Sequence, residues 1–567
     1  MARAARESRY RALLALIVLA ALGLRLAGLG WGLPNALHLF SYHPDETTLL
    51  MGSSPIFGGI DLLSGRLLPP ANVQDFYAYG TLSYEIYSLA LIFGSGYHFI
   101  GALAPHGHFS APALAHAYLA CRFVSALMGV GTVWAVYALG RRLFGPACGL
   151  LAALLMALAP LHVLQSHYMT VDVMATFFLT LSLVWAARLV DEAALPRAAL
   201  WRACALSGLF AGLSAATKYS GVLCLLSLAA ALVWRAKAGR LAVSPMVIGG
   251  LIGLAAAAAA FLITEPGAIL QTRQFLADTA YESNHVMHHG EIYFQDTGLG
   301  WVYLFTRNLD AGLSLPWTLA FVAAIVYAAV RRARGDAFLA AFALPTYLLV
   351  GAAQSRYARY DMPLLPVAAI WTARLMVDAV ALAKTRGVKI AAAAGGAAVC
   401  AVAALSAVML VRPLCLPDTR DLAARWIDAH ASGASVGFAN RPWFWSPPLN
   451  PYFNLPRPGS WRMQTPPAEQ ARFVCDPASP FDVALLDSAR PQIVVLSEFE
   501  YYDPLRLRQP SALRYLSALK AGYTQAAVFR AVHPLGGSAA IDGLPTQDLP
   551  TDMLYPSPTV IVFVRRS

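Results

Sequence analysis

Apolar blocks of roughly 20 residues recur along the chain as far as residue 411, and they constrain its fold more than any other feature. A block of this length crosses the hydrocarbon core of a bilayer as one helix. The residues are 58% hydrophobic and only 13% charged, whereas about 25% of the residues are charged in an ordinary soluble domain. We therefore predict a polytopic α-helical membrane protein.

Window hydropathy predicts about eleven membrane spans. They cover residues 12–30, 113–140, 146–164, 171–190, 203–217, 219–235, 244–264, 313–330, 337–353, 362–382 and 390–411. The first block follows a basic N-terminus, as in a signal peptide, but Arg25 interrupts it and no small-x-small cleavage site follows. We interpret it as an uncleaved first span.

Basic residues give an independent check on this predicted membrane topology, because short cytoplasmic connections are enriched in lysine and arginine. Clusters at the N-terminus and after alternate spans all fall on one side: Arg3, Arg6, Arg9, Arg11, Arg141, Arg142, Arg197, Arg202, Arg235, Lys237, Arg240, Arg331, Arg332, Arg334, Lys384, Arg386 and Lys389. The topology thus predicts a cytoplasmic N-terminus. It also explains the net charge of +11, so no nucleic-acid partner is predicted.

One further apolar segment, residues 81–104, is excluded as a span by the same rule. Counting it would place Arg141 and Arg142 outside the cytoplasm. We predict instead that the outer loop 31–112 carries amphipathic or re-entrant helices at the outer interface.

Two domains are predicted. Residues 1–411 form the transmembrane domain, and the odd number of spans leaves residues 412–567 outside the cytoplasm. In that tail, a helix around 418–430 and strand-like runs at 492–496 (QIVVL) and 559–564 (TVIVFV) predict a small α/β domain. Export of the tail would also permit a disulfide between Cys415 and Cys475.

Polar and charged residues collect in five predicted outer segments: 42–46 (YHPDE), 165–172 (QSHYMTVD), 218–220 (KYS), 265–300 and 354–361 (QSRYARYD). Ionisable groups near membrane depth are costly, so they usually serve a function or pair with each other. Acidic and basic groups at a single interface suit a reaction between a phosphate leaving group and a hydroxyl or amine nucleophile.

Asp45 and Glu46 are the first candidates for catalysis. A carboxylate beside a desolvated pocket can accept a proton from an attacking hydroxyl. If the loop is extended, the two side chains point in opposite directions, so only one of them faces the substrate. The alternative is structural: Asp45 or Thr47 caps a helix over residues 47–52.

Arg356, Arg359 and Lys218 are the candidate phosphate ligands, because guanidinium groups match phosphate oxygens and a leaving phosphate develops negative charge. The structural alternative for the two arginines is snorkelling to lipid headgroups. Lys218 lies in a very short outer turn against the usual charge bias, which favours phosphate binding.

Two other groups of residues are weaker candidates, for metal binding and for sugar stacking. His285, His288, His289 and Glu291 lack the spacing of a helical zinc motif, so a loop or a lipid-phosphate contact is favoured over a metal. Trp426, Trp443, Trp445 and Trp461 suit either sugar stacking or, more commonly, core packing.

The chain resembles the GT-C superfamily of integral membrane glycosyltransferases, in the branch of the protein O-mannosyltransferases and the lipid A aminoarabinose transferases (glycosyltransferase family 39 and its bacterial relatives). The matching segments are 42–46 (YHPDE), 137–145 (YALGRRLFG), 160–172 (PLHVLQSHYMTVD), 212–219 (GLSAATKY) and 356–366 (RYARYDMPLLP). Each motif alone is weak, but the five in series, over residues 10–410, are specific. The tail does not resemble the soluble domains of the family.

The resemblance implies a polyprenyl-phosphate sugar donor and transfer with inversion to an extracytoplasmic acceptor (protein, lipid A or glycan). It places the catalytic aspartate at Asp45, with Glu46 beside it and a second acidic position at Asp172. It also places cations against the donor phosphate at Lys218, Arg356 and Arg359. The five predicted outer segments supply one further candidate phosphate ligand, Tyr219, and five candidate substrate contacts: His43, His167, Tyr168, Tyr357 and His289.

The resulting hypothesis is an inverting glycosyltransferase in a bacterial inner membrane, with the active site and the tail in the periplasm. The alternative is a transporter or flippase of lipid-linked saccharides, although such proteins usually show internal repeats and the sequence shows none. A membrane anchor for a sensory tail would leave Asp45, Lys218 and Arg356 unexplained. No cofactor is predicted; a divalent cation is compatible with the chemistry but is not indicated.

Overall fold

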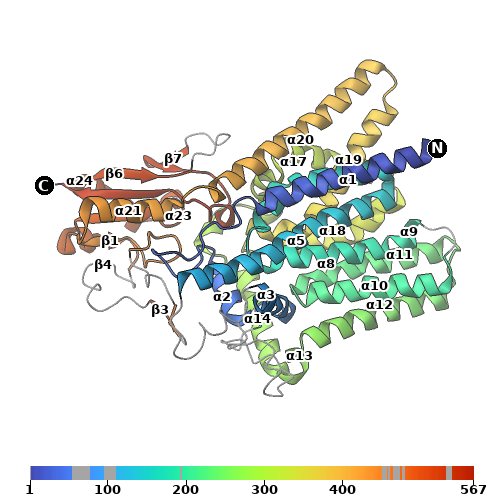
Figure 1. Cartoon of the computed structure of the whole chain (residues 1–567), viewed down its shortest axis with the longest axis horizontal. Coiled ribbons are helices and arrows are strands. Elements are labelled where there is room, and N and C mark those ends of the chain that lie inside the picture. The colour runs from blue at the N-terminus through green and yellow to red at the C-terminus, as the bar shows by residue number, and fades with distance from the viewer. Residues whose placement is uncertain are drawn as a thin grey trace.

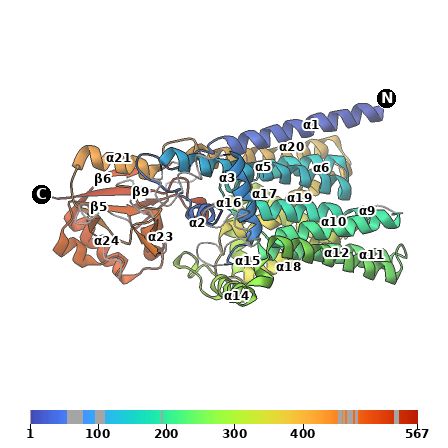
Figure 2. The same cartoon turned by 60° about the horizontal axis from the view of Figure 1, so that its bottom comes forward.

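The computed structural model describes residues 2–53, 77–94, 110–191, 195–449, 456–457, 460–463, 473–474, 479–531 and 539–566. Within these residues, a bundle of long helices adjoins a smaller α/β domain at one end (Figure 1). The N-terminus lies at the opposite end of the bundle from this domain, in both views (Figure 2).

Eight helical runs of the described residues are long and apolar enough to cross a bilayer. They are α5 (Ala111–Phe144), α8 (Val171–Ala186) with α9 (Arg188–Asp191), α10 (Arg197–Ala215), η1 (Tyr219–Cys224) with α11 (Leu225–Lys237), α12 (Val243–Thr264), α18 (Arg334–Ala352), η4 (Ala358–Leu364) with α19 (Leu365–Leu382), and α20 (Arg386–Leu414), whose run extends through α21 (Thr419–Ala431). The chain is therefore a multi-pass helical membrane protein.

The three remaining predicted spans are also helical, as α1 (Ala2–Leu26), the shorter α6 (Pro146–Leu158) and the shorter α17 (Leu315–Arg331). They do not meet the same criterion of length and composition, so the number eleven stays a prediction. Helix α1 also ends before the predicted residue 30, because Gly28 adopts a positive φ of 82° and its α-carbon lies against Leu414.

Short helices connect the spans at the end of the bundle near the α/β domain. They are α2 (Pro44–Ser53), α3 (Thr81–Gly94), α7 (Pro160–Gln165), α13 (Gly267–Leu270), α14 (Thr272–His288), η2 (Ile292–Phe294), α15 (Gly300–Tyr303), η3 (Leu304–Leu309) and α16 (Asp310–Leu313). Both views place α2, α3 and α14 between the bundle and the α/β domain. The predicted interfacial helix over 81–104 is helical from Thr81 to Gly94, and its other residues lie outside the described ranges.

Close packing of small residues joins α10 to α12. A β-carbon added at Gly208 would lie 2.0 Å from the Gly253 carbonyl oxygen, and one added at Gly212 would lie 2.2 Å from that of Ala257. In a bilayer, helices associate through such close backbone approach because lipid offers no hydrophobic gain. These glycines therefore fix the position of the α10 end, which leads directly into Lys218.

The C-terminal α/β domain is built on a five-stranded sheet of order β4-β1-β5-β9-β6. Its strands are β1 (Val436–Phe438), β4 (Phe473–Val474), β5 (Ile493–Ser497), β6 (Tyr523–Phe529) and β9 (Val560–Arg565). β1 pairs in parallel with β4 and β5, whereas β9 pairs antiparallel with β5 and β6. Both predicted strands and the predicted helix are confirmed, as β5, β9 and α21. Two small hairpins add β2 (Pro456–Arg457), β3 (Ser460–Met463), β7 (Ala539–Ile541) and β8 (Leu544–Thr546).

Helices cover both faces of this sheet. Ile493, Val495 and Val560 pack with α21 on one face, and Val494 and Ile561 pack with α23 (Glu498–Arg506) and α24 (Pro510–Gly522) on the other. Successive strand residues point to opposite faces, so the continuous apolar runs QIVVL and TVIVFV bury both faces, which is why the domain forms three layers. The remaining short turns are η5 (Leu485–Ala489) and η6 (Thr551–Met553).

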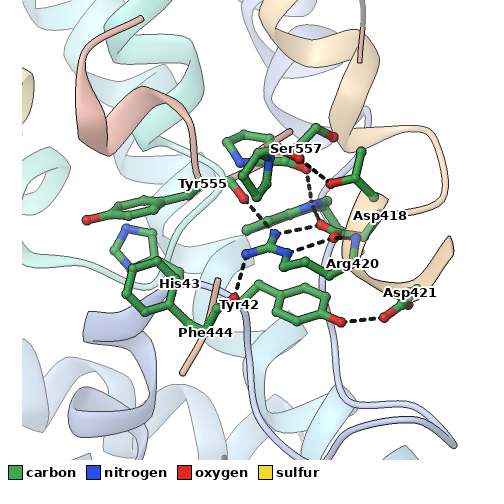
Figure 3. A network of polar contacts seen from close by, with 12 residues as sticks. Tyr42, His43, Asp418, Arg420, Asp421, Phe444, Tyr555 and Ser557 are labelled. Carbon is green, nitrogen blue, oxygen red and sulfur yellow. Dashed lines mark hydrogen bonds and ion pairs between the residues drawn. The ribbon is translucent and has the colours of Figure 1, made fainter. Parts of the chain in front are cut away.

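A buried arginine network joins the α/β domain to the first outer loop of the membrane domain (Figure 3). Arg420, at the start of α21, donates to both carboxylate oxygens of Asp418 at 2.7 Å, and its guanidinium lies 3.8 Å from the centre of the Tyr42 ring. The Trp31 indole donates to Asp418 at 2.9 Å, and the Tyr42 hydroxyl donates to Asp421. These contacts fix the segment that leads from Trp31 to Asp45.

A buried and a half-buried carboxyl group near α3 give the protein an expected pH dependence of stability. Burial raises the pKa of Glu265 to about 7, although the Thr81 amide and hydroxyl both donate to it. Burial and the nearby Glu265 raise the pKa of Glu85 to about 7. A folded pKa above the ordinary value means that the stabilising contribution is complete below pH 4.5 and is lost as the pH rises through 7.

We expect the melting temperature of the purified protein to fall between pH 5 and pH 8, with Glu265 contributing up to about 3 kcal/mol of the loss. The variant Glu265→Gln should show a flatter profile in the same thermal-unfolding assay. An identical pH profile in wild type and variant would contradict this assignment.

Candidate active site

Asp45 and Glu46 lie in the first turn of α2, which begins at Pro44. The segment is therefore not an extended loop. A helix is present over the predicted residues 47–52, but it begins three residues earlier, so neither Asp45 nor Thr47 is its N-cap. Pro44 suits the first helical position because its missing N–H would have no partner there. Consecutive residues of a helix point about 100° apart, so the two carboxylates still have different surroundings.

Glu46 is fully buried and connects three parts of the structure. Arg122 of α5 donates to its two oxygens at 2.8 and 2.7 Å, the Met169 amide donates at 2.7 Å, and the Ser41 hydroxyl also donates. Burial alone would raise the pKa of Glu46, but the Arg122 charge and these hydrogen bonds hold it below its ordinary value. A carboxylate with this many donors is a poor proton acceptor.

Asp45 is half-buried, and its partner is Arg359 of η4. The closest carboxylate and guanidinium atoms are 3.5 Å apart. Arg359 also lies 3.8 Å from Asp552 of the α/β domain, while its Nη1 is buried without a hydrogen-bond acceptor among the described residues. The guanidinium thus faces Asp45 with donor capacity left for a further anion. Its burial excludes the alternative that Arg359 snorkels to lipid headgroups.

His43 orients the backbone at Asp45. Its Nδ1 accepts the Asp45 amide at 3.3 Å, and its ring contacts Tyr168 and Tyr555 at centroid distances of 4.4 and 4.7 Å. Burial lowers the pKa of His43 to about 4, so the imidazole is neutral at pH 7. It therefore supports the loop without adding charge to the site.

Lys218 lies at the turn between α10 and η1, where its ammonium group contacts Asp172 at 2.6 Å. The same nitrogen lies 4.4 Å from the centre of the Tyr360 ring, and the Arg359 guanidinium lies 5.7 Å from that ring. Lys218 and Arg359 therefore flank one aromatic ring close to Asp45. Glu282 of α14 lies within electrostatic reach of Lys218, Arg359 and Asp45, and burial raises its pKa.

Arg356, the other predicted phosphate ligand, has different partners. It donates to the Thr297 hydroxyl at 2.7 Å and to the Gly298 carbonyl at 2.8 Å, and it lies over the Tyr303 ring at 5.8 Å. The side chain is half-buried against the outer loop, so it neither points freely into lipid nor contacts Asp45.

The remaining sequence candidates divide into two groups. Tyr357 lies at the site, with its ring 4.1 Å from the Arg359 guanidinium, and Tyr168 packs on His43. His167 contacts two backbone carbonyls, Tyr219 donates to the Tyr77 carbonyl, and the exposed His289 contacts Asn284. Within the described residues, the contacts of these last three are to other parts of the chain than Asp45.

The sequence also suggests candidate metal ligands and candidate sugar-stacking residues. Within the described ranges, no three His, Cys, Asp or Glu side chains group to hold a metal ion, and His285 contacts Glu291 at 3.5 Å. Trp426 and Trp445 pack against hydrophobic clusters, whereas Trp443 is 48% exposed. The Trp461 side chain and Cys475, and with it the proposed disulfide, lie outside the described residues.

Sequence reasoning missed the contribution of the α/β domain. Asp552, fully buried in η6, accepts the Ala358 and Arg359 amides at 3.0 and 2.9 Å, and Tyr555 packs on His43. Burial raises the pKa of Asp552, while the Arg359 charge lowers it. No local motif marks these residues, since Asp552 lies almost 200 positions from its partners. The missed Arg122 and Glu282 likewise lie in segments without a motif.

Comparisons with known proteins agree with this architecture. Residues 114–263 match the family described as dolichyl-phosphate-mannose-protein mannosyltransferase. The oligosaccharyltransferase AglB of Archaeoglobus fulgidus, solved with an inhibitory peptide and a dolichol-phosphate, is 12% identical and has a TM-score of 0.52 over 97% of this chain and 77% of its own. The two chains thus share a fold.

Other matches are more distant in shape. ArnT of Cupriavidus metallidurans, solved with undecaprenyl phosphate, is 14% identical over 97% of each chain, with a TM-score of 0.47. The Pmt1-Pmt2 protein O-mannosyltransferase of S. cerevisiae, solved with its sugar donor, is 17% identical over 51% of this chain and 36% of that chain, with a TM-score of 0.34. No curated protein matches the chain.

Proposed function

We propose that the chain is a GT-C type membrane glycosyltransferase, because residues 114–263 match the family described as dolichyl-phosphate-mannose-protein mannosyltransferase. In this proposal it transfers a monosaccharide from a polyprenyl-phosphate donor to an extracytoplasmic acceptor with inversion. Asp45 is the proposed catalytic base. The donor class rests on the family match and on the cations beside Asp45. The bacterial inner membrane and the periplasmic side are part of the same proposal.

One observation carries the proposal: Arg359 lies 3.5 Å from the half-buried Asp45, and Lys218 lies over the ring of Tyr360, the residue next to Arg359, at the end of the helical bundle nearest the α/β domain. Arg359 keeps a buried N–H without an acceptor in the described structure. Guanidinium and ammonium groups bind phosphate oxygens strongly in such a partly desolvated setting. The arrangement therefore suits a lipid phosphate held beside a base.

The proposed reaction is a single displacement. The acceptor hydroxyl or amine attacks the anomeric carbon as its proton passes to Asp45, the bond between that carbon and the phosphate oxygen breaks, and the electron pair stays on the phosphate. Lys218 and Arg359 stabilise the negative charge that develops there. One displacement from the face opposite the leaving group inverts the anomeric configuration.

In this proposal the other two candidate catalytic carboxylates, Asp172 and Glu46, position other residues. Asp172 holds Lys218 at 2.6 Å, and Glu46 fixes the first outer loop through Arg122. Both are therefore positioning residues, which revises the prediction that they take part in catalysis. Arg356 orders the outer loop beside the site rather than contacting Asp45.

A transfer assay tests the proposal. Purified full-length protein in lipid nanodiscs is mixed with polyprenyl-phosphate sugars labelled in the sugar and with membrane glycolipids or glycoproteins as acceptors. We expect label to become covalently attached to an acceptor, with the anomeric configuration inverted. Label that never leaves the lipid, but changes leaflet in vesicles, would support the flippase alternative and refute the proposal.

Lys218 provides a prediction specific to donor binding. The variant Lys218→Met is expected to raise the donor KM roughly tenfold to a hundredfold, because a charge-assisted phosphate contact is worth about 1.5–3 kcal/mol. Donor titration in the transfer assay measures this. Arg273→Met, a change of one exposed cation at α14, is the matched control. Equal donor KM values in Lys218→Met and wild type would remove Lys218 from donor binding.

A further inference from the structure

A cavity of about 120 Å³ lies between the membrane domain and the α/β domain, outside the group of residues around Asp45. The outer loop of the membrane domain contributes one wall, which includes Tyr303 and Arg307. Helix α23 contributes a second wall with Tyr502 and Asp503, and the segment before η6 contributes Asp548. Both domains are therefore required to form it.

Two arginines and three carboxylates line this cavity: each arginine is paired with one carboxylate, and the third, Glu498, accepts the Gln547 and Thr559 amides. Arg307 pairs with Asp548 at 2.7 Å, and Arg506 pairs with Asp503 at 2.8 Å. A free phosphate or a phosphorylated headgroup would have to compete with these carboxylates for both guanidinium groups. A neutral ligand with several hydroxyl groups fits better, because a carboxylate accepts and a guanidinium donates hydrogen bonds to neighbouring hydroxyls without a change of net charge.

Aromatic rings complete the lining. Tyr293, Tyr303, Tyr502 and Phe499 contribute apolar surface beside the charged pairs. A tyrosine combines a flat apolar face with a polar hydroxyl, which matches a sugar ring with an apolar C–H face and a polar edge. Pockets with apolar walls and few oriented polar groups are typical small-molecule sites.

One helical turn separates the cavity from the catalytic residues. Thr551 and Leu554 face the cavity, whereas Asp552 and Tyr555, next to them in the sequence, contact Arg359 and His43. On the membrane side, Thr297 and Tyr303 line the cavity and also contact Arg356. The cavity thus adjoins the site through η6, and on the membrane side it reaches Arg356, which lies beside the site.

We infer that this cavity is an acceptor subsite that holds a neutral saccharide unit, remote from the hydroxyl that reacts. The inference rests on the proposed function, which requires an acceptor, and it names the chemical class of that acceptor as an uncharged sugar. Binding energy from such a remote unit serves to position the reacting group.

Saturation-transfer NMR on the full chain tests the inference. The protein is held in lipid nanodiscs free of sugar-based detergents, since a maltoside headgroup would compete. The probes are methyl glycosides of mannose, glucose and galactose, and the 6-phosphates of the same sugars. We expect at least one neutral glycoside to bind and Tyr502→Ala to weaken that binding roughly tenfold, through loss of a stacking ring.

A second variant is expected to reverse the preference of the cavity for neutral sugars over sugar phosphates. Asp548 has a φ of 54°, which asparagine tolerates, so Asp548→Asn removes the charge without backbone strain and leaves Arg307 unpaired. We expect this variant to bind the sugar phosphates more tightly than the neutral glycosides. Asp542→Asn is the matched control, because Asp542 also has a positive φ of 48° and pairs with an arginine, Arg508, outside the cavity.

The outcomes separate this inference from the proposed function. Binding of a labelled polyprenyl phosphate is measured on the same samples and should be unchanged in Tyr502→Ala and Asp548→Asn. Suppose that donor binding is normal. If the wild type then binds no sugar, or if both variants bind sugar as the wild type does, the subsite is overturned and the proposed function stands. Failure of the wild type to bind or use the lipid donor would instead overturn the proposed function.

Discussion

The variant Asp45→Asn is expected to fold normally and to lose roughly 10²–10⁴-fold in transfer rate, the usual contribution of a general base. Asparagine keeps the shape and suits the first turn of α2, but it cannot accept the acceptor proton. Among the described residues, it also leaves Arg359 with only Asp552 as an acidic neighbour within 4 Å. Single-turnover transfer from labelled polyprenyl-phosphate sugar measures the loss, because donor binding and chemistry are then separated.

The control for Asp45→Asn is Asp296→Asn. Asp296 is exposed in the outer loop, and its φ of 54° suits asparagine. This variant should retain the wild-type rate. If Asp45→Asn, with a melting temperature equal to wild type, also transfers sugar at the wild-type rate, Asp45 is not the base.

The largest expected effect on stability comes from Arg122→Met. Arg122 is fully buried, donates to both oxygens of Glu46, and also donates to the Leu29 carbonyl at 2.9 Å. Removal of one partner of a buried ion pair leaves the other charge uncompensated and typically costs about 3–5 kcal/mol. We expect a large fall in melting temperature and in the yield of folded protein, measured by thermal unfolding in nanodiscs.

The double variant Glu46→Gln/Arg122→Met is the internal control, since it removes both charges. It should recover part of the lost stability, because no unpaired charge remains buried. A single variant Arg122→Met as stable as wild type would show that the pair does not hold the first outer loop. The experiment also distinguishes Glu46, which acts on stability, from Asp45, which acts on rate.

The membrane architecture was predictable because hydropathy and the positive-inside bias act through local sequence. For residues 81–104, charge placement excludes a span, which stays a prediction, while the helix itself is seen over Thr81–Gly94. The strands at 493–497 and 560–565 were predictable for a similar reason, since runs buried on both faces are continuously apolar. The predicted start of α2 is three residues late, because a proline fits a loop as well as a first helical position, and Pro44 takes the helical one.

The site was only partly predictable, because pairing between distant segments leaves no local pattern. The sequence predicts that four charged residues lie on one face: Asp45, Asp172, Lys218 and Arg359. The structure adds that they form two ion pairs, Lys218 with Asp172 and Arg359 with Asp45. Asp552 could not be identified, since its role depends on how the α/β domain docks through Arg420 and Trp31. For His167, a predicted substrate contact, the structure shows two backbone carbonyl partners, which sequence does not reveal.

The central claim is that the acidic and phosphate-binding residues lie on one face of the membrane, opposite the arginine-rich turns. Single cysteines are introduced at positions 282, 356, 142 and 237 of a cysteine-free variant, and intact cells are treated with a membrane-impermeant maleimide. We predict that cysteines at 282 and 356 are labelled from outside and that those at 142 and 237 are labelled only after permeabilisation. Labelling of 282 and 356 only from the cytoplasmic side, or from opposite sides, would contradict the account.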